Sequence, residues 1–437
     1  MMTSFQEPAR EVPVVEQTDV LIAGAGPAGI MAAVAAARQG VRVRLIEAQG
    51  ALGGIWTTGC LPHIIELKRQ GLPAELAERL TTAGAGARGR HSLNRVVKDD
   101  ASCRRDFDPE TFKVVLDRMA GEAGVAVRLY TRVSAAYRDA AGRLETLVTD
   151  SKSGREAWQA RVFVDCTGDG DLGAQAGCSF DIGHPESGGC QPMSMMAILA
   201  GGGRSGQPPF NIREWGRNKD WLQAEIRRGG HDPSYSRPTM FLVRDGVIIM
   251  MANHQYGYRQ PDAQKLTDAT IAGRAENLAI VEALRGLGGQ WAGLELMTQS
   301  AQIGVRESRR IRGLYRVDRD DLVRGARFDD AICRVAFCVD IHALDPARHK
   351  GIEAAAVTVE PYDIPLRSLI AAEAPNLMMA GRCISGDFYA HASYRVTGDA
   401  AAMGEAAGVA AAQAVRQSVD PGELDFATLR PHLPALD

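Results

Sequence analysis

The sequence predicts an α/β fold, with a doubly wound and mostly parallel sheet interrupted by an inserted α+β domain. Two observations lead to this prediction. Residues 18–192 begin with an apolar run, a glycine-rich turn and an alanine-rich helix, and residues 358–420 return to the same texture. Residues 193–357 instead combine glycine and proline clusters with short runs typical of strands. We therefore expect a discontinuous first domain into which the second is inserted.

The first elements form a minimal βαβ unit. After a flexible polar arm at residues 1–17, the apolar run at 20–23 suits a buried strand. The alanine-rich helix at 30–39 is stopped by Gly40, and a second strand follows at 41–46. Two parallel strands joined by one helix imply a right-handed crossover.

The later elements are read from the same patterns of apolar residues and chain breakers. Helices are expected at 108–123, 262–287 and 398–416. Strands are expected at 125–129, 144–149, 162–165, 240–252, 335–341 and 376–381, and a C-terminal tail at 421–437.

The composition excludes several classes of protein. The 437 residues are 45% hydrophobic and 24% charged with a formal net charge of -3, which gives no bulk positive field to attract nucleic acid or anionic lipid. No secretory signal and no bilayer-spanning apolar segment is visible, so we expect a cytoplasmic protein without a membrane span. The eight scattered cysteines indicate reduced thiols. The oligomeric state is left open, with a homo-oligomer among the alternatives.

A glycine-rich turn joins the first strand to the first helix. It reads Gly24, Ala25, Gly26, Pro27, Ala28 and Gly29. Gly24 permits the sharp bend, Gly26 lets backbone amides approach a pyrophosphate, and Gly29 lets the helix pack closely on the strand. The helix N-terminus then presents its positive end to the anion. The turn therefore predicts a Rossmann-like dinucleotide site.

Glu47 strengthens this prediction because it ends the second strand. A carboxylate there can accept hydrogen bonds from both ribose hydroxyls and repels a 2′-phosphate. A second glycine pattern at 201–206 is followed by Pro208 and Pro209, which prevent an opening helix from presenting its amides. We therefore expect 201–206 to be a loop, and no separate NAD(P)H domain is predicted.

Further motifs accompany the turn along the chain. They are Leu52-Gly53-Gly54, residues 163–171, 302–310 and 362–365, Gly381-Arg382, and a small-residue helix from Gly398. Together these segments resemble the FAD-dependent oxidoreductase family related to fumarate reductase and succinate dehydrogenase flavoproteins, with its glutathione-reductase-like FAD-binding fold. The resemblance covers most of residues 18–200 and 300–415.

The resemblance implies an extended, non-covalently bound FAD whose isoalloxazine ring lies between the two domains. To the turn and Glu47 it adds these cofactor-binding residues: Gly53, Gly54, Thr167, Gly168, Gly381, Arg382, Asp399 and Ala402. The helix from Gly398 can point its positive end at the flavin pyrimidine. In the alternative interpretation it is a packing helix without a cofactor role.

His391 and Arg395 lie between the last predicted strand and the small-residue helix. A similar His-x-x-x-Arg stretch holds a substrate carboxylate in fumarate reductase-like proteins, and an arginine fork matches a carboxylate in a bidentate way. A histidine can add a hydrogen bond or move a proton at neutral pH. Alternatively, Arg395 contacts the FAD pyrophosphate or a carboxylate at the domain interface.

Three arginines, Arg306, Arg309 and Arg310, have the spacing of one helical face. Such a face can receive an anionic substrate, with Arg306 as the preferred functional member. It can equally brace the junction of the two domains or pair with the nearby residues Asp318, Asp320 and Asp321.

Asp340 and His342 alternate along a predicted strand, which puts both side chains on one face. His342 can then be a general base whose tautomer is held by Asp340, and His254 is a weaker candidate for the same task. An ordinary pair at the end of a sheet is the alternative. With Asp345 and His349 the spacing fits no metal signature, so no metal site is predicted.

These features predict an enzyme in which FAD takes a hydride from a C–H bond of a small polar or anionic alcohol or amine. His391 or His342 accepts the proton, and an arginine fixes the substrate's orientation. The electron acceptor is oxygen, a quinone or an electron-transfer protein. Two alternatives stay open: reduction of an activated C=C bond with an arginine supplying the proton, and an FAD-binding subunit that needs a partner chain.

Overall fold

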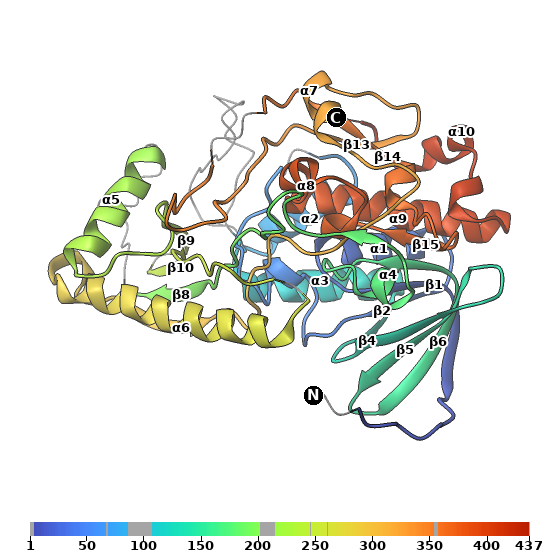
Figure 1. Ribbon diagram of the computed structural model, residues 1–437, viewed down its shortest axis with the longest axis horizontal. Coiled ribbons are helices and arrows are strands. Elements are labelled where there is room, and N and C mark those ends of the chain that lie inside the picture. Colours follow the sequence, from blue (N-terminus) through green and yellow to red (C-terminus); the bar gives the residue numbers. More distant parts are fainter. Residues whose placement is uncertain are drawn as a thin grey trace.

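The computed structural model describes residues 4–66, 69–85, 107–201, 215–244, 246–259, 261–353 and 357–436. A seven-stranded sheet and a four-stranded sheet lie toward opposite ends of the molecule, with helices against both (Figure 1). A large hydrophobic core surrounds the first sheet, and side chains between residues 197 and 294 form a separate core on the second. The predicted α/β class with a Rossmann-like sheet is confirmed.

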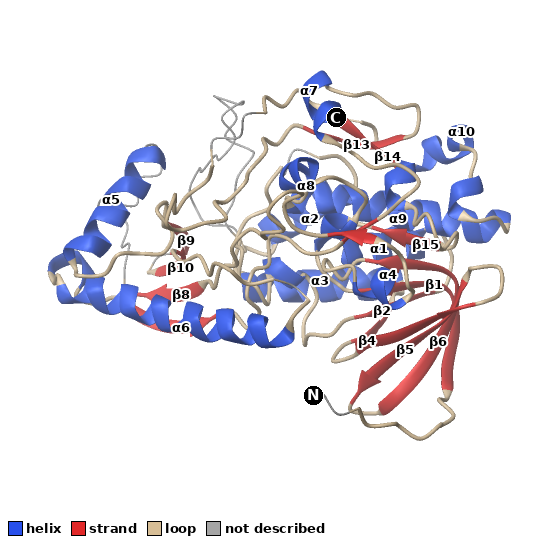
Figure 2. Ribbon diagram, viewed as in Figure 1, coloured by secondary structure: helices blue, strands red, loops and turns tan. Residues whose placement is uncertain are grey.

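The larger sheet is parallel at its centre, with the order β3-β2-β1-β6-β5-β4 and with β15 also paired to β6. β1 runs parallel to β2 and β6, while β4, β5 and β6 form an antiparallel extension (Figure 2). Residues 20–23 are fully buried, because the parallel part has both faces covered. The strands are β1 (Val14–Ala23), β2 (Val43–Ile46), β3 (Ala126–Arg128), β4 (Arg132–Arg138), β5 (Leu144–Ser151), β6 (Gly154–Asp165) and β15 (Leu377–Met379).

Two helices, α1 (Pro27–Arg38) and α9 (Thr397–Gln417), pack against each other beside this sheet. A Cβ atom added at Gly404 or Gly408 would overlap a backbone carbonyl oxygen of α1. The small residues of α9 are therefore required by this close approach. The predicted helices at 30–39 and 398–416 correspond to α1 and α9.

The other helices of the larger core are short or peripheral. They are α2 (Leu72–Thr82), α3 (Pro109–Ala123), α4 (Asp171–Gln175), α7 (Arg319–Arg324), α8 (Phe388–Tyr394) and α10 (Phe426–Leu429). Single 3-10 turns are η1 (Gly54–Trp56), η4 (Leu366–Leu369), η5 (Gly381–Cys383), η6 (Pro421–Glu423) and η7 (Arg430–His432). α3 corresponds to the helix predicted at 108–123, and Asp108 caps it, since its side chain accepts a hydrogen bond from Glu110 N.

The smaller sheet is antiparallel, in the order β11-β8-β10-β9, and the long helix α6 lies along it in Figure 1. Its elements are β8 (Ala197–Ala200), α5 (Trp215–Arg228), β9 (Thr239–Arg244), β10 (Val247–Met251), α6 (Ala263–Gly286), η3 (Gly289–Trp291) and β11 (Glu295–Gln299). The helix predicted at 262–287 is α6, and the run at 240–252 forms β9 and β10. The predicted inserted domain at 193–357 stays a proposal, with its compact part at 197–299.

Two further sheets have two strands each. β7 (Phe180–Asp181) pairs with β12 (Arg310–Ile311), and β13 (Ala331–Val335) pairs with β14 (Tyr362–Pro365). The strand expected at 335–341 is wrong, since β13 already ends at Val335. Beyond it the chain leaves the ladder to approach α8, where Asp340 N donates to Ala392 O at 3.2 Å.

The described residues include no helix that is long and apolar enough to cross a membrane. The glycine pattern at 201–206 lies outside the described residues except for Gly201, so the expected loop stays a prediction. Seven of the cysteines are described, and no disulfide joins any two of these seven.

Candidate active site

The turn between β1 and α1 has the geometry that its glycines predict. Gly24 has φ of 90°, and a Cβ atom on Gly29 would overlap the Gly24 carbonyl oxygen. Nothing lies within 4 Å of a Cβ placed on Gly26, and no described side chain caps the start of α1. The amides of the first helical turn are therefore open to an anion, which is the arrangement that a pyrophosphate requires.

Glu47 lies beside this turn, as the sequence predicts. Its carboxylate accepts hydrogen bonds from Ala25 N at 2.6 Å and Gln49 N at 2.7 Å. Burial raises the pKa of Glu47, and the backbone amides oppose that shift. Each oxygen keeps a second lone pair for a ribose hydroxyl.

The double glycine closes against the same turn. Gly53 N donates to Ala25 O at 2.7 Å, and Gly53 and Gly54 both have positive φ. A Cβ atom on Gly54 would lie 3.0 Å from the Cα atom of Gly26. A side chain at either position would therefore strain the backbone or narrow the space in front of α1.

Residues 167–169 follow β6 and are held by a buried carboxylate. Asp165, which is 0% exposed, accepts hydrogen bonds from Thr167 N, Thr167 Oγ1 and Gly173 N. Arg382 then donates to Asp169 Oδ1 at 3.1 Å and to Val305 O at 2.6 Å. Arg382 thus ties the β6 loop to the segment that carries Arg306.

Several of the predicted cofactor residues share one property: they are partly exposed among buried neighbours. Between Thr397 and Val415, Ala402 is the one residue of α9 that is not buried. Partly exposed members of the set are Gly24, Gly26, Pro27, Gly54, Thr167, Gly168, Arg382 and Ala402. Open amides, a ribose-type carboxylate and this exposed band fit an extended dinucleotide cofactor.

Asp399, in the first turn of α9, forms a fully buried ion pair with Arg69. Burial raises the pKa of Asp399, and Arg69 counteracts this. Gly398 N donates to Ile65 O at 2.7 Å, so residues 65–66 lie across the start of α9. The remaining oxygen, Asp399 Oδ2, is buried and bonds to no described residue.

Arg306 lies apart from Arg309 and Arg310, so the prediction that the three share a helical face is wrong. Residues 301–309 form no helix, and an extended chain points successive side chains in different directions. Arg309 pairs with Asp171, and Arg310 pairs with Glu307 at 2.9 Å instead of with the acidic residues at 318–321.

Arg306 uses one edge of its guanidinium within the protein. Nη1 donates to Pro192 O at 2.7 Å and to Ser194 Oγ at 2.9 Å. Nε and Nη2 take no part in these hydrogen bonds to described residues, and the residue is partly exposed. Burial and the neighbouring charge of Arg395 lower the pKa of Arg306 to about 10, so it stays a cation at neutral pH.

Arg395 contacts a carboxylate of the inserted segment, which corresponds to one of the alternatives drawn from the sequence. Nη2 donates to Asp340 O at 2.7 Å and to Asp340 Oδ2 at 3.1 Å. Burial opposes ionisation of Asp340, but His342, Arg395 and Arg306 together hold its pKa below the usual value. Asp340 is therefore ionised at neutral pH.

His342 lies in the same cluster, 4% exposed. Its Nε2 atom is 3.2 Å from Asp340 Oδ2, and its Nδ1 atom is 3.0 Å from His254 Nε2. Burial and Arg306 lower the pKa of His342 to about 4 despite Asp340. No group of three or more potential metal ligands is found in the described part of the chain.

His391 has a different environment from the one the sequence suggests. It is 0% exposed in α8, and neither ring nitrogen bonds to a described residue. Burial and the charges of Arg310, Arg395 and Arg382 hold the pKa of His391 well below its usual value. It is a neutral, enclosed imidazole next to Tyr394.

Sequence reasoning missed the residues that complete the cluster. Gln191 Oε1 accepts a hydrogen bond from His342 N at 3.0 Å, and the ring of Tyr235 lies 3.9 Å from that of His254. Tyr256 and Ser194 were likewise not identified. The alternation of His254 and Tyr256 was a signal, but no spacing could show that 254 meets 342.

The fold and the turn define an α/β dinucleotide-binding protein with a charged cluster at the junction of its two cores. The sequence matches the family model described as FAD dependent oxidoreductase over residues 19–433. The chain belongs to this family, and its cofactor is FAD. A search of curated proteins finds no match.

Solved structures of similar fold include a flavin-dependent brominase, at 16% identity, with 95% of this chain and 83% of that chain covered and a TM-score of 0.49. A geranylgeranyl bacteriochlorophyll reductase-like protein from Thermoplasma acidophilum has 12% identity, coverages of 95% and 82%, and a TM-score of 0.45. The p-nitrophenol 4-monooxygenase of Pseudomonas putida has 11% identity, coverages of 96% and 84%, and a TM-score of 0.45. These likenesses do not bear on the substrate.

Proposed function

We propose that the protein is an FAD-dependent dehydrogenase or oxidase that takes a hydride from a C–H bond of a small anionic alcohol or amine. The observation that carries this proposal is the free edge of Arg306. Nε and Nη2 form the bidentate edge of a guanidinium, and the hydrogen bonds of Arg306 to described residues come from Nη1 instead. A carboxylate is the ligand that best matches this edge.

The charges around Arg306 favour an anionic ligand. The charge of Arg395 adds to burial in lowering the pKa of Arg306, so two guanidinium cations lie close together. Asp340 neutralises Arg395, and Glu307 is already paired with Arg310 at 2.9 Å. No carboxylate in the described ranges lies within ion-pair distance of Arg306. A substrate carboxylate would supply the missing negative charge.

The residues of this chain then divide the work. FAD supplies the hydride acceptor when it is bound. Arg306 holds the substrate carboxylate and thereby orients the C–H bond, and Arg395 keeps Asp340 ionised. His342, linked to Asp340, takes part in removing the proton from the substrate hydroxyl or amine. His391 is the weaker choice because both of its ring nitrogens are enclosed.

The sequence motifs give this proposal further support. Their similarity to fumarate reductase flavoproteins is consistent with a carboxylate substrate, although the relation to that branch of the family is itself a proposal. Cytoplasmic location and the acceptors oxygen, quinone or electron-transfer protein also stay predictions.

The proposal is tested by anaerobic titration of the FAD-loaded protein with 2-hydroxy acids and 2-amino acids, each beside its amide. We expect one acid to bleach the visible flavin absorption while its amide is far less effective. Bleaching by dithionite but by no acid would refute the proposal. Reoxidation of the dithionite-reduced protein by an enoate would instead assign the reverse reaction.

A further inference from the structure

Four side chains form an unbroken hydrogen-bonded array that starts beside Arg395. Asp340 Oδ2 is 3.2 Å from His342 Nε2, and His342 Nδ1 is 3.0 Å from His254 Nε2. His254 Nδ1 is in turn 3.1 Å from the hydroxyl of Tyr256. The array therefore runs from a partly exposed carboxylate through two buried imidazoles to a partly exposed phenol.

The direction of every hydrogen bond in the array follows from the charge of Asp340. An ionised carboxylate only accepts, so His342 must carry its proton on Nε2 and accept at Nδ1. His254 must then donate from Nε2 and accept at Nδ1. The phenol of Tyr256 is consequently the donor to His254, and its oxygen, which also lies 3.3 Å from Ser234 O, keeps lone pairs that can accept a proton.

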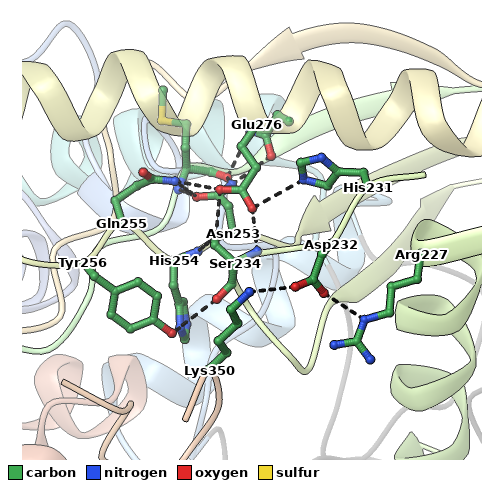
Figure 3. Close-up of polar contacts among 12 residues, drawn as sticks. Arg227, His231, Asp232, Ser234, Asn253, His254, Gln255, Tyr256, Glu276 and Lys350 are labelled. Atoms are coloured by element: carbon green, nitrogen blue, oxygen red, sulfur yellow. Dashed lines mark hydrogen bonds and ion pairs between the residues drawn. The ribbon is translucent and has the colours of Figure 1, made fainter. Parts of the chain in front are cut away.

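The array is held in place by its surroundings. The ring of Tyr235 packs against that of His254 with centroids 3.9 Å apart and planes inclined by 30°, and His254 N donates to Ser234 Oγ at 2.8 Å. Figure 3 shows Ser234 anchored in turn by Glu276 on α6, to which its backbone N and its hydroxyl each donate at 2.7 Å. The geometry is thus fixed before any substrate binds.

Burial keeps both imidazoles neutral. It is the main cause that lowers the pKa of His254 well below its usual value, with Arg306 and His342 adding to the effect. An imidazolium is disfavoured at either position, so a proton can pass only if each ring accepts one proton while it gives up another. Two neutral imidazoles in series have this property.

We propose that Tyr256 is the residue that accepts the substrate's proton, and that His254, His342 and Asp340 relay it. The inference rests on the proposed function. With FAD bound to take the hydride of the substrate C–H bond, the O–H or N–H bond would break, a C=O or C=N bond would form, and the proton would form a new bond to the Tyr256 oxygen. Tyr256 passes its own proton to His254 Nδ1, His254 Nε2 passes one to His342 Nδ1, and His342 Nε2 passes one to Asp340.

The structure also satisfies the array after the transfer. Tyr256 then accepts from His254 Nδ1 and donates its new proton to Ser234 O, which lies 3.3 Å from the hydroxyl (Figure 3). At the other end, the charges of Arg395 and Arg306 favour the ionised form of Asp340 over its protonated form. With 17% of its side chain exposed, Asp340 can release the proton to solvent.

The charges that face Tyr256 suit this role. Burial raises its pKa, and Arg306 opposes that shift from the segment after β11, while Tyr235 and Glu276 add to it. Arg306 is also linked to the segment that carries Tyr256, because Ser194 Oγ accepts from Arg306 Nη1 at 2.9 Å and donates to Asn253 O at 2.7 Å. An anionic substrate held by Arg306 would present its hydroxyl or amine near Tyr256.

The kinetic test compares Tyr256→Phe with Tyr258→Phe, which removes a hydroxyl outside the array. With the substrate found in the titration above, we expect the rate of anaerobic flavin reduction to fall about a hundredfold in Tyr256→Phe and to stay unchanged in Tyr258→Phe. His254→Gln should lower this rate by the same factor, and the double variant Tyr256→Phe/His254→Gln should be no slower than either single variant. FAD content and absorption should match the wild type in all four.

Reduction of Tyr256→Phe at the wild-type rate would overturn the relay and leave the proposed function standing. If no compound bleaches the wild type, the proposed function fails, and nitrogen-15 NMR of histidine-labelled protein still decides the relay. We expect His254 and His342 as neutral Nε2–H tautomers near neutral pH, assigned with His254→Gln and His342→Gln. A proton on Nδ1 of His254 would contradict the array.

Discussion

The glycine turn and the arginine–histidine cluster differ in what builds them. The turn at 24–29 consists of backbone from one short segment, and its shape depends on what glycine permits at Gly24 and Gly29. The cluster consists of side chains from segments far apart in sequence, with Arg395 meeting Asp340 and His342 meeting His254. A local motif therefore identifies the cofactor site, while tertiary packing assembles the chemistry.

The two regions are therefore expected to respond differently to substitution. At Gly29 in the turn, one added methyl group would overlap the backbone of Gly24. In the cluster, a substitution does not force the backbone to move, but it removes a charge or a hydrogen-bonding group. The predictions below therefore expect effects on folding and FAD binding from the first region, and effects on substrate chemistry from the second.

The largest effect is expected at Gly29. A Cβ atom there would overlap the Gly24 carbonyl oxygen, so Gly29→Ala must shift the backbone of the turn. We expect a loss of about 3 kcal/mol or more in the free energy of unfolding, measured by urea denaturation of the FAD-free protein.

Gly26→Ala is the matched control, because nothing lies within 4 Å of its added Cβ atom. The FAD-free variant should unfold at nearly the wild-type urea concentration, and its FAD affinity should fall because the methyl group occupies the approach of the pyrophosphate. Wild-type FAD binding by Gly26→Ala would contradict the assignment of this turn.

A smaller loss of stability is expected when the ion pair of the cluster is broken. Arg395→Met leaves Asp340 with His342 alone, and we expect about 2 kcal/mol of destabilisation. Adding Asp340→Asn removes the stranded charge, so the double variant should recover part of the loss. If the stability loss of the double variant equalled the sum of the losses in Arg395→Met and Asp340→Asn, the two residues would not be coupled.

The smallest effect concerns Glu405, which lies in α9 and accepts a hydrogen bond from Leu72 N at 2.9 Å. Burial raises its pKa from 4.5 to about 7, so the folded protein holds a proton that the unfolded chain has lost. The free energy of unfolding should therefore fall as the pH rises from about 4.5 to about 7.

Glu405→Gln removes that titration and keeps an acceptor for Leu72 N. We expect it to weaken the pH dependence by on the order of 1 kcal/mol and to be more stable than the wild type above the window. Urea denaturation at the two ends of the window measures this. An unchanged pH dependence would mean that Glu405 is ionised in the folded protein throughout.

The fold was predictable because its signals are local. The glycine turn and Glu47 form a motif that can be recognised within one short stretch of sequence. The close contact between α1 and α9 requires glycine at 404 and 408, which the sequence shows directly. The helix expected around Arg306 was wrong, because residues 301–309 form no helix. The spacing of three arginines along the sequence does not by itself show whether the chain is helical or extended.

The cluster was predictable only in part. Arg306, Arg395 and His342 were all identified from their chemistry, and Asp340 was identified as the partner of His342, but the other partners were not. The contact between His254 and His342 spans 88 residues of sequence and depends on how the two cores meet. Tyr235, Tyr256 and Gln191 have no motif, since their roles come from the rings and amides that they happen to contact.

The central claim is that Arg306 binds the carboxylate of the substrate. The most direct measurement is the efficiency of anaerobic flavin reduction by the active acid relative to its amide, in the wild type and in Arg306→Gln. A charge-assisted bidentate contact predicts a preference of about a hundredfold for the acid in the wild type and nearly none in the variant. An equal preference for the acid in both proteins would contradict the claim.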